Sequence, residues 1–591
     1  MKIDFEENSR RRKKVVEEYS RRDNYLGIFK LPWVILMIYG IYNVYSRKVL
    51  GSMAVLLLGE IIVFIIVCKF HEKIKERIRF EKAMIDINQR NEKRMNGEWT
   101  KFKDIGEEFI DHNHPYAMDL DVVGTHSLFQ YLNSTQTDYG RRRFANDLLY
   151  AQYRKKELKE RQQAILELSK QYDWTSRIEY LFSKIGRNQK VTQFIKEIQN
   201  PRHFLPNRLL QGLVRVIWIP TVSLLLLALL FFDTVSLRAA LVLVGLQLLV
   251  TMLCRSFVKA YIGVLNTLPK NFLCYNELLN ELSKMEFYAS RLVQIKQELT
   301  EARQAFKELF KLVEKINQSH NLIAAFLLNG FALWNIRNAI ALDAWKQQYS
   351  KKMEEWFQEL GELESIMSFS NLPRVCRTVS LPEYVEQKRS FSAKGLGHPL
   401  IEEEKRVCND FSLEDSIYII SGSNMSGKTT FMRTVGINLI LAQAGSFVCA
   451  RGMVFSKLKV ITSMRVADDV KEGISTFYAE LLRIKKIVDQ AHKDKRTLFL
   501  IDEIFRGTNS IDRLKGAEGV LEELSKANVV GMITTHDLDV CNLEKFYNNI
   551  RNVSFHEQYV NGEIRFDYKL KYGRSKTTNA QFLLKKVGII K

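Results

Sequence analysis

The sequence predicts an α/β domain built around a phosphate-binding loop, joined to a mainly α-helical body and to two apolar helical hairpins. Three observations predict this combination. A glycine-rich loop stands between a short apolar run and a helical pattern in the last third of the chain. Only 9 Pro and 29 Gly occur in 591 residues, which favours long uninterrupted helices. Two pairs of long apolar stretches each enclose a very short polar turn.

The size of the chain indicates several domains, because a single hydrophobic core stops growing well below 591 residues. With 46% hydrophobic and 26% charged residues, the composition is that of a folding chain. We expect five segments: a basic amino terminus with the first hairpin (1–75), a helical segment (76–208), the second hairpin (209–256), a second helical segment (257–385) and the α/β domain (386–591).

The cysteine and histidine residues predict no metal site. The seven cysteines form no CxxC pair and no Cys/His cluster along the sequence, which favours reduced thiols in a cytosolic setting. His112 and His114 lie beside Asp111, but other ligands at suitable spacing are missing from the sequence pattern. We therefore expect a satisfied loop there rather than a metal centre.

The two apolar pairs have the form of membrane-spanning hairpins. The first covers about Ile28 to Tyr45 and about Val49 to Phe70, and the second about Val216 to Phe232 and about Leu237 to Cys254. Each stretch is close to the length that crosses the hydrocarbon layer. Basic residues such as Arg10 to Lys14 flank the outer ends, and basic flanks mark the cytoplasmic side. We expect multi-pass anchoring in the cell membrane, with the helical body and the α/β domain in the cytoplasm.

The alternative is that these stretches are buried helices of a large soluble core. Lys30, Glu60, Arg238 and Gln247 interrupt them and favour that interpretation. A further apolar run from Leu322 to Trp334 contains Asn329 and is too short to span, so we expect it in the protein core.

The remaining segments before the α/β domain read as helices, about Phe80 to Pro206 and about Leu268 to Met367. In the later segment, apolar or small residues recur in steps of three and four and share one helix face. Coiled-coil or lever-like helices fit this pattern, and so do simple packing helices. Pro373 and the stretch around Ser390 to Gly397 mark the boundary of the α/β domain. The residues on the predicted face are Leu292, Ile295, Leu299, Ala302, Phe306, Leu309 and Val313.

The phosphate-binding loop fits the pattern G-x-x-x-x-G-K-S/T and lies in the right context. Ile417 to Ile420 is a predicted strand, and Thr430 to Ala444 is a predicted helix. Glycines let backbone N–H groups turn toward phosphates, while the helix amino terminus adds a favourable dipole. We expect Lys428 to pair with the β and γ phosphates of ATP and Thr429 to hold Mg²⁺. The predicted nucleotide-binding residues are Gly422, Ser423, Asn424, Met425, Ser426, Gly427, Lys428, Thr429 and Thr430.

Two further strands are expected to bring acids and a polar sensor to the same site. Thr497 to Ile501 is a buried strand ending in Asp502 and Glu503. Asp502 is placed to hold Mg²⁺, and Glu503 to orient or deprotonate the attacking water. Val529 to Ile533 ends in Thr534-Thr535-His536, and ligands bind at the carboxyl ends of parallel strands. We expect His536 to act in catalysis.

The residues around these elements resemble the MutS family of DNA mismatch-repair ATPases. The family's loop, roughly G-P-N-M-x-G-K-S/T-S/T, appears at Gly422 to Thr430, and its D-E-x-x-R-G-T-x-x-x-D stretch appears at Asp502 to Asp512. Shorter matches are Asp468-Asp469 with Ser475 to Glu480, Thr535-His536, His398-Pro399-Leu400 with Asn409-Asp410, and Thr137 to Arg142 with Arg161-Gln162. The match is strong over the α/β domain and weak over the helical body.

The resemblance implies an ABC-type P-loop ATPase domain with a mixed or parallel sheet, preceded by helical core and lever segments. It also implies a homodimer with composite ATP sites, each completed by a loop of the partner subunit. Ser475 matches the residue that acts across the dimer. The family couples ATP binding to clamp-like closing around DNA.

Some positions depart from the family pattern. Ser423 replaces the usual proline, which a phosphate-binding loop tolerates. Phe505 replaces a small residue beside the acids, and we expect it to alter coupling to the dimer interface. We expect no amino-terminal mismatch-reading domain, because the first apolar hairpin occupies that position. The aromatic residue that would stack on adenine is not identifiable.

The formal net charge of +21 favours a phosphate-bearing partner, either nucleic acid or anionic lipid, with a solubilising surface bias as the alternative. Arg10 to Lys14 would meet membrane lipids. A second cluster would face either enclosed DNA or solvent. Its residues are Arg141, Arg142, Arg143, Arg154, Lys155, Lys156 and Lys159.

The hairpins and the resemblance together favour an ATP-hydrolysing, dimeric, membrane-anchored protein that acts on mismatched, branched or recombining DNA. The alternative is a membrane scaffold whose ATP-driven closure recruits a protein partner without binding DNA. A transporter is disfavoured, because two hairpins with few polar intramembrane residues make a poor substrate path.

Overall fold

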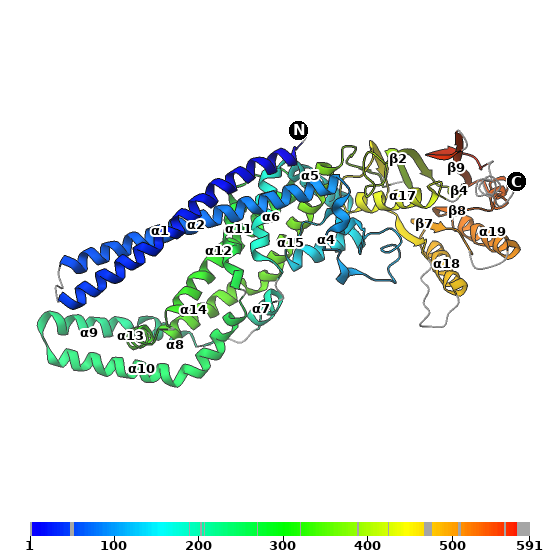
Figure 1. The fold of residues 1–591 in the computed structure, drawn as a ribbon. Helices are drawn as coiled ribbons and strands as arrows, with labels where there is room; N and C mark the ends of the chain where they lie inside the picture. The colour runs from blue at the N-terminus through cyan, green and yellow to red at the C-terminus, as the bar shows by residue number, and fades with distance from the viewer. Residues whose placement is uncertain are drawn as a thin grey trace. The chain divides into compact units, whose positions relative to one another are not determined.

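The structure is a computed structural model of the 591-residue chain, and it falls into two compact units (Figure 1). The first unit comprises Met1–Asn133, Ala145–Tyr180 and Phe369–Lys591, and the second comprises Ser134–Phe144 and Leu181–Ser368. The predicted five-segment division stays a prediction. The residues described are 3–47, 52–187, 190–200, 204–205, 207–268, 270–319, 321–386, 389–423, 425–465, 476–505, 510–560 and 563–575.

A six-stranded, mostly parallel sheet forms the centre of the α/β part of the first unit. Its strand order is β10-β9-β4-β8-β7-β6, and only the β9–β10 pair is antiparallel within the described strands. Every residue of β4, β7 and β8 is buried, as apolar runs in a sheet covered on both faces require. The strands are β4 (Ile417–Ser421), β6 (Lys459–Ser463), β7 (Thr497–Asp502), β8 (Val530–Thr535), β9 (Ile550–Val560) and β10 (Glu563–Tyr572).

Helices cover both faces of this sheet because successive side chains of a strand point to opposite sides. On one side of β7, Leu500 meets Gly436 of helix α17 (Lys428–Gln443), where an added Cβ would lie 3.0 Å from the Leu500 Cδ1 atom. Phe499 and Ile501 point the other way. They join the core under α18 (Thr476–Lys493) and α19 (Ser510–Lys526).

A smaller sheet precedes the large one, with strand order β1-β5-β2-β3. The stretch expected to mark a domain boundary is itself strand β2. Near this sheet, the Sγ atoms of Cys376 and Cys449 lie 3.7 Å apart, and the Arg406 Nη1 atom lies within 3.0 Å of both. Two of the cysteines, which lie far apart along the sequence, are thus neighbours in space. The strands are β1 (Glu383–Tyr384), β2 (Ser390–Leu396), β3 (Asn409–Glu414) and β5 (Gly452–Phe455).

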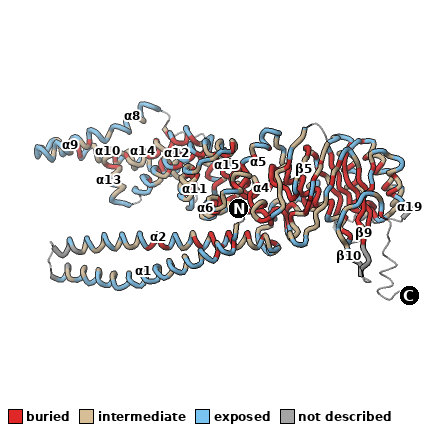
Figure 2. The backbone as a smooth tube through the Cα atoms, turned by 90° about the horizontal axis from the view of Figure 1, so that it is seen from above, coloured by how far each residue is buried: buried red, intermediate tan, exposed pale blue. Residues whose placement is uncertain are grey.

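The first predicted hairpin forms two long antiparallel helices, α1 (Phe5–Arg47) and α2 (Ser52–Met95) (Figure 1). Their apolar limbs are exposed along much of their length (Figure 2). Near the polar end of the limbs, His71 lies between Asp23 and Lys30, at 2.7 and 2.6 Å. Lys30, which interrupts the apolar stretch, therefore has a partner across the hairpin.

Shorter helical elements connect this hairpin to the sheets. They pack through buried residues of the helical segment, including Leu128 and Ile165. The elements are η1 (Glu98–Lys101), η2 (Glu107–Phe109), α3 (Leu128–Leu132), α4 (Asp138–Leu149), α5 (Lys155–Lys170), α6 (Tyr172–Ile185) and α16 (Leu372–Val375). A further short helix, η6 (Val540–Lys545), lies between β8 and β9.

The second unit is helical. Six of the seven positions predicted to share one face of α12 (Ser290–Gln318) are buried, while Val313 is half-buried and its neighbour Leu312 is buried instead. The other helices are α7 (Lys190–Ile198), α8 (Arg208–Val216), α9 (Trp218–Phe231), α10 (Thr234–Ile262), η3 (Gly263–Thr267), η4 (Lys270–Phe272), α11 (Leu273–Lys284), α13 (Leu322–Ala332), α14 (Trp334–Tyr349), η5 (Ser350–Lys352) and α15 (Met353–Phe369).

Helices α9 and α10 form the second predicted hairpin. The Asp233 carboxylate accepts hydrogen bonds from the backbone N–H groups of Val235 and Ser236 at the turn. Gln247, which argued for a soluble core, donates to the Thr221 hydroxyl across the hairpin at 2.7 Å. The amide nitrogen of this residue is thus paired by its neighbour, while its Oε1 atom is buried without a hydrogen-bond partner among the described residues.

Three helical stretches among the described residues are long and apolar enough to cross a membrane by length and composition: Phe5–Asn43, Arg208–Phe231 and Thr234–Thr267. The fourth predicted span begins outside the described residues and continues in α2. The expectation that Leu322 to Trp334 is core was wrong, because Leu322, Ile323 and Phe326 of α13 are exposed. The segment is apolar as the sequence shows, but an apolar sequence does not reveal which side of a short helix packs against another helix.

Candidate functional site

The predicted phosphate-binding loop connects β4 to α17 and depends on two glycines. Gly422 has a φ of 148°, and an added Cβ would lie 2.7 Å from the Phe555 backbone oxygen. Gly427 has a φ of 101°, a conformation that L side chains rarely adopt. Between them Met425 is exposed, and Ser426 is buried with no hydrogen-bond partner for its hydroxyl. Asn424 lies outside the described residues.

Lys428 begins α17 with its side chain turned back toward the loop. Its Nζ atom donates to the carbonyl oxygens of Gly422 and Ser423, at 2.8 and 2.9 Å. It also lies 3.5 Å from the Nε2 atom of His536, which follows β8. The ammonium group is thus buried inside the loop's curve.

Asp502 at the end of β7 gathers hydroxyl groups from two neighbouring elements. The Thr429 hydroxyl of α17 lies 2.9 Å from its Oδ1 atom. The Thr534 hydroxyl of β8 donates to the same Oδ1 atom at 2.7 Å. A carboxylate beside a hydroxyl matches the oxygen ligands that Mg²⁺ prefers.

Glu503 is held in a tight turn directly after Asp502. Its φ is 53° and that of Phe505 is 59°, in the left-handed region that non-glycine residues rarely occupy. Two contacts maintain this turn: the Glu503 N–H donates to the Thr534 hydroxyl at 2.9 Å, and the Phe505 N–H donates to the Glu480 carboxylate at 2.5 Å. The Glu503 Oε1 atom lies 2.6 Å from His536 Nε2.

The two departures from the family pattern have structural explanations. The Ser423 hydroxyl donates to the Glu557 carboxylate of β9 at 2.5 Å, so the serine fixes the loop through a bond that proline cannot make. Phe505 is buried, stacks edge-on against Phe477 and lies against Gly516 of α19. Its visible role is packing between α18 and α19.

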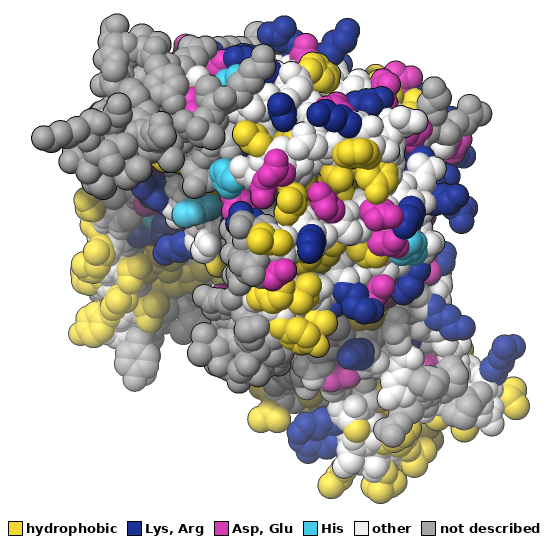
Figure 3. Space-filling view, turned by 90° about the vertical axis from the view of Figure 1, so that its right-hand side faces the viewer, with side chains coloured by type: hydrophobic (Ala, Val, Ile, Leu, Met, Phe, Trp, Pro, Cys, Tyr) yellow, Lys and Arg dark blue, Asp and Glu magenta, His cyan; other side chains and the backbone are white. Residues whose placement is uncertain are grey.

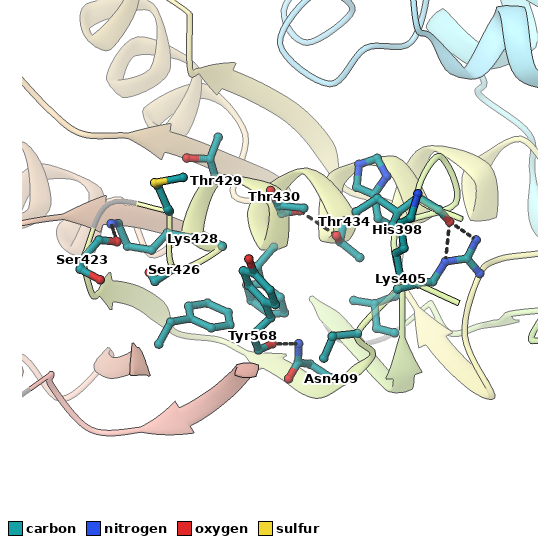
Figure 4. A pocket seen from close by; sticks show the side chains of 18 of the residues that line it. His398, Lys405, Asn409, Ser423, Ser426, Lys428, Thr429, Thr430, Thr434 and Tyr568 are labelled. Atoms are coloured by element: carbon teal, nitrogen blue, oxygen red, sulfur yellow. Dashed lines mark hydrogen bonds between the residues drawn. The ribbon is translucent and has the colours of Figure 1, made fainter. Parts of the chain in front are cut away.

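A cavity of about 550 Å³ extends from the loop, and its far end is lined by residues that the sequence did not assign to nucleotide binding (Figure 4). The Asn409 side chain of β3 holds β10 in place by donating to the Tyr568 carbonyl at 3.0 Å. Burial, with Arg433 and Arg406 nearby, lowers the pKa of His398 to about 3, so this imidazole is neutral. His398 and Asn409 belong to the short family-like matches of the sequence, whereas Tyr568 stands in none of them. The far end is lined by Leu396, His398, Ile401, Val407, Asn409 and Tyr568.

Two contacts tie the loop's helix to the helical segment of the first unit. The buried Arg161 of α5 pairs with Asp147 and donates to the Ala444 carbonyl, at the carboxyl end of α17, at 2.9 Å. Asp121 pairs with Arg433 of α17 at 2.8 Å and with Arg465 at the end of β6 at 2.7 Å. The weakly matching Arg161-Gln162 motif thus contacts the α/β domain directly.

The predicted basic cluster is exposed only in part: Arg141 is buried and Arg143 half-buried, whereas Arg142, Arg154, Lys155, Lys156 and Lys159 are exposed. Arg143 pairs with Glu362 at 2.8 Å. The expectation that Arg141 to Arg143 face DNA or solvent together was therefore wrong for Arg141, because charge runs in sequence do not reveal buried partners. On the face shown in Figure 3, described Lys and Arg side chains are interspersed with Asp and Glu.

Both ring nitrogens of His114 have partners within its own part of the fold. His114 Nε2 lies 3.2 Å from the Leu149 carbonyl, and its Nδ1 atom accepts the Ala117 N–H at 3.1 Å. No group of three potential ligands occurs among the described residues. His114 is thus the satisfied loop residue that the sequence predicted.

The loop, the acids and the open cavity fit a nucleoside triphosphate with Mg²⁺. Glycines in such a loop let backbone N–H groups turn toward an anion, and the Ser426 hydroxyl has no hydrogen-bond partner among the described residues. Thr429 and Asp502 would hold the ion, which supplies charge neutralisation on the phosphates when bound. Ser475, Asp468-Asp469 and Arg506 to Asn509 lie outside the described residues, so the predicted trans-acting position is not placed.

Fold and site together define a P-loop nucleotide-binding protein. Residues 418–584 match the family model for MutS domain V. The DNA mismatch repair protein MutS of Staphylococcus haemolyticus is 31% identical over 233 residues, 38% of this chain and 26% of that protein. The protein of the same name from Listeria monocytogenes is 29% identical over 235 residues, 38% and 27%. MutS protein homolog 4 of Mus musculus is 31% identical over 229 residues, 37% and 23%.

Residues 418–584 thus form a domain of the MutS domain V family. The matched region spans about a quarter of the length of these curated relatives, and the family model covers the α/β domain that carries the phosphate-binding loop.

Proposed function

We propose that this protein hydrolyses ATP, with Mg²⁺, in the site between α17, β7 and β8. The observation that carries the proposal is the convergence of the Thr429 and Thr534 hydroxyl groups, each within 3.0 Å of the Asp502 carboxylate, beside the phosphate-binding loop. Lysine, threonine and the two acids are the groups that position phosphates and an attacking water in P-loop enzymes.

Each residue of the site has a distinct role in the proposed hydrolysis. Lys428 leaves its loop carbonyls to neutralise the terminal phosphates. Thr429 and Asp502 hold the metal ion. Glu503 orients the attacking water and accepts its proton, and His536, 2.6 Å from that carboxylate, fixes its orientation.

Glu503→Gln tests this assignment, because the amide keeps the shape of the side chain but cannot accept a proton. The variant should bind ATP and hydrolyse it far more slowly, whereas Lys428→Ala should weaken binding itself. Both are measured on the full chain in detergent, by nucleotide binding and by phosphate release. ATP turnover of Glu503→Gln at the wild-type rate would show that Glu503 takes no part in hydrolysis.

We also propose a homodimer in which a loop of the partner completes each site, with Ser475 reaching across. The support is the resemblance of Ser475 to Glu480 in the sequence to the family segment. Chemical crosslinking of the full chain with and without a non-hydrolysable ATP analogue tests it. A monomer under both conditions would contradict it.

We further propose that the two hairpins anchor the chain in a membrane. Large apolar side chains such as Ile38, Leu229 and Leu253 are between 61% and 75% exposed, an arrangement that water penalises and lipid does not. With basic flanks on the cytoplasmic side, Ser46 and Ser236 should be labelled from outside the cell after cysteine substitution, and Lys591 should not. Recovery of the full chain in solution without detergent would contradict the anchoring.

DNA is the proposed partner, because the matched relatives are named as DNA mismatch repair proteins. The alternative is an ATP-driven membrane scaffold that recruits a protein. The discriminating experiment measures ATP turnover of the full chain with single-stranded, duplex and branched DNA over a range of salt. Stimulation that weakens steeply with salt supports DNA contact, since each phosphate contact releases counterions. Turnover indifferent to every DNA, together with no binding at low salt, favours the scaffold.

A further inference from the structure

Helix α13 (Leu322–Ala332) carries an apolar face that no described residue covers. Leu322 is 87% exposed, Ile323 73%, Phe326 60% and Leu327 48%. Positions i, i+1, i+4 and i+5 lie on the same side of an α-helix. Four large apolar side chains thus form one stripe on a short helix.

The carboxyl-terminal part of α13 packs on the second hairpin, while the exposed stripe lies on its amino-terminal turns (Figures 1 and 2). At Gly330 an added Cβ would lie 3.1 Å from the Val244 Cγ1 atom and 3.5 Å from the Leu248 Cγ atom of α10. Val244 lies about 15 Å along α10 from its first residue, at a rise of about 1.5 Å per residue. The contact therefore falls midway along the apolar stretch that would cross a hydrocarbon layer about 30 Å thick.

The polar groups of α13 are satisfied without water, as a helix in lipid requires. Asn329 donates from its side chain to the Ala325 carbonyl at 2.8 Å and accepts the Asn335 N–H at 3.0 Å. The Asn321 side chain accepts the first free N–H groups of the helix, those of Ile323 and Ala324, at 2.9 and 3.2 Å. None of these bonds needs a solvent partner.

The two ends of the segment lie together. The indole N–H of Trp334, just after α13, donates to the carbonyl of Lys315, in the last turn of α12, at 2.8 Å. Eleven residues of helix reach only about 16 Å, too short to cross. A segment that starts and finishes at the same place enters and leaves on one side. Tryptophan is enriched at the boundary between membrane and water.

We propose that α13 is a re-entrant membrane segment, buried in the hydrocarbon layer beside α9 and α10 with its Leu322, Ile323, Phe326 and Leu327 stripe against acyl chains. This rests on the proposed anchoring of the second hairpin. It adds to that anchoring a membrane element that does not span.

The test uses the full chain in vesicles of phosphatidylcholine and phosphatidylglycerol containing nitroxide-labelled lipid. An environment-sensitive fluorophore is attached at Phe326→Cys in a cysteine-free background whose ATP binding matches the wild type. Leu229→Cys on α9 is the matched lipid-facing control, and Tyr288→Cys, exposed in the second unit outside the apolar helices, is the aqueous control. Benzoylphenylalanine at position 326 in the native chain, with mass analysis of its photoadduct, gives the same answer if the cysteine-free chain does not fold.

Quenching at position 326 comparable with that at 229, with none at 288, is the expected result, as is a lipid photoadduct. Quenching at 229 but not at 326 overturns the re-entrant segment and leaves the hairpin anchored. A photoadduct to a second copy of the chain shows a protein-covered stripe and also overturns it. Absence of quenching at both 229 and 326 overturns the anchoring and the inference together.

Discussion

Thr534 offers the sharpest test of how the site is held together. Its buried hydroxyl donates to Asp502 at 2.7 Å and accepts the Glu503 N–H at 2.9 Å, so one oxygen positions both acids. Thr534→Val keeps the shape of the side chain and removes both bonds. A hydrogen bond to a charged group contributes about 1.5–3 kcal/mol. If that energy is lost wholly from the transition state, kcat falls roughly 10- to 150-fold.

The assay is steady-state phosphate release from the full chain over a range of ATP and Mg²⁺ concentrations. Thr534→Val should lower kcat and leave nucleotide affinity nearly unchanged, while Thr534→Ser, which keeps the hydroxyl, should recover most of the rate. Thr535→Val is the matched control. Its hydroxyl accepts only the Asp537 N–H, at 3.0 Å, and touches neither acid. Turnover in Thr534→Val within about twofold of Thr535→Val would refute the positioning of the acids by Thr534.

Three further predictions follow from the same contacts. Mixing a Ser475 variant with a Lys428 variant, each inactive alone, should restore part of the ATP turnover, because each mixed dimer holds one site without defects. No recovery of turnover after verified subunit exchange would exclude a site shared across the dimer. For His398, the unfolded chain takes up a proton below about pH 6.5 and the folded chain does not, so stability falls as the pH drops from about 6.5 toward 3, by up to ~1.4 kcal/mol per pH unit. His398→Gln should flatten that slope in thermal unfolding measured between about pH 7 and pH 5, and an unchanged slope would show that another group causes it. Arg161→Met leaves the Asp147 carboxylate buried without its charged partner, so it should lower the free energy of unfolding by about 3–5 kcal/mol in denaturant titrations. Arg154→Met, on an exposed side chain, is the control and should change the free energy of unfolding little. Equal effects of the two substitutions would contradict the role of the buried pair.

The sequence predicted the parts of the site that are set by local patterns. A strand followed by a glycine-rich loop and a helix fixes where Lys428 and Thr429 lie, and a buried strand ending in acids fixes Asp502. Because parallel strands end at one edge of the sheet, the pattern predicted that Thr429 and Asp502 meet there, and their side-chain oxygens lie within 3.0 Å of each other. Local spacing likewise predicted most of the buried face of α12.

What the sequence did not predict depends on contacts between distant segments. Asn409 and Tyr568 meet across the cavity because β10 folds back over the loop, and no short-range pattern encodes that approach. Cys376 and Cys449 read as scattered residues for the same reason. Arg141 stands in a run of basic residues and was therefore expected at the surface, but it is buried. A run of charges in the sequence does not reveal which side chains are paired inside the fold.

The capping of α17 by Arg161 has a mechanical consequence. The helix is a stiff rod of 16 residues, about 24 Å long, with the phosphate-binding loop at one end and the guanidinium group at the other. A rod does not absorb displacement along its axis, so a small shift of the loop when a nucleotide arrives moves the Ala444 carbonyl with it. Arg161 is itself locked to Asp147, so α5 must either follow or break a buried bond. If the proposed ATP binding shifts the loop, the displacement would therefore reach the helical segment through this contact.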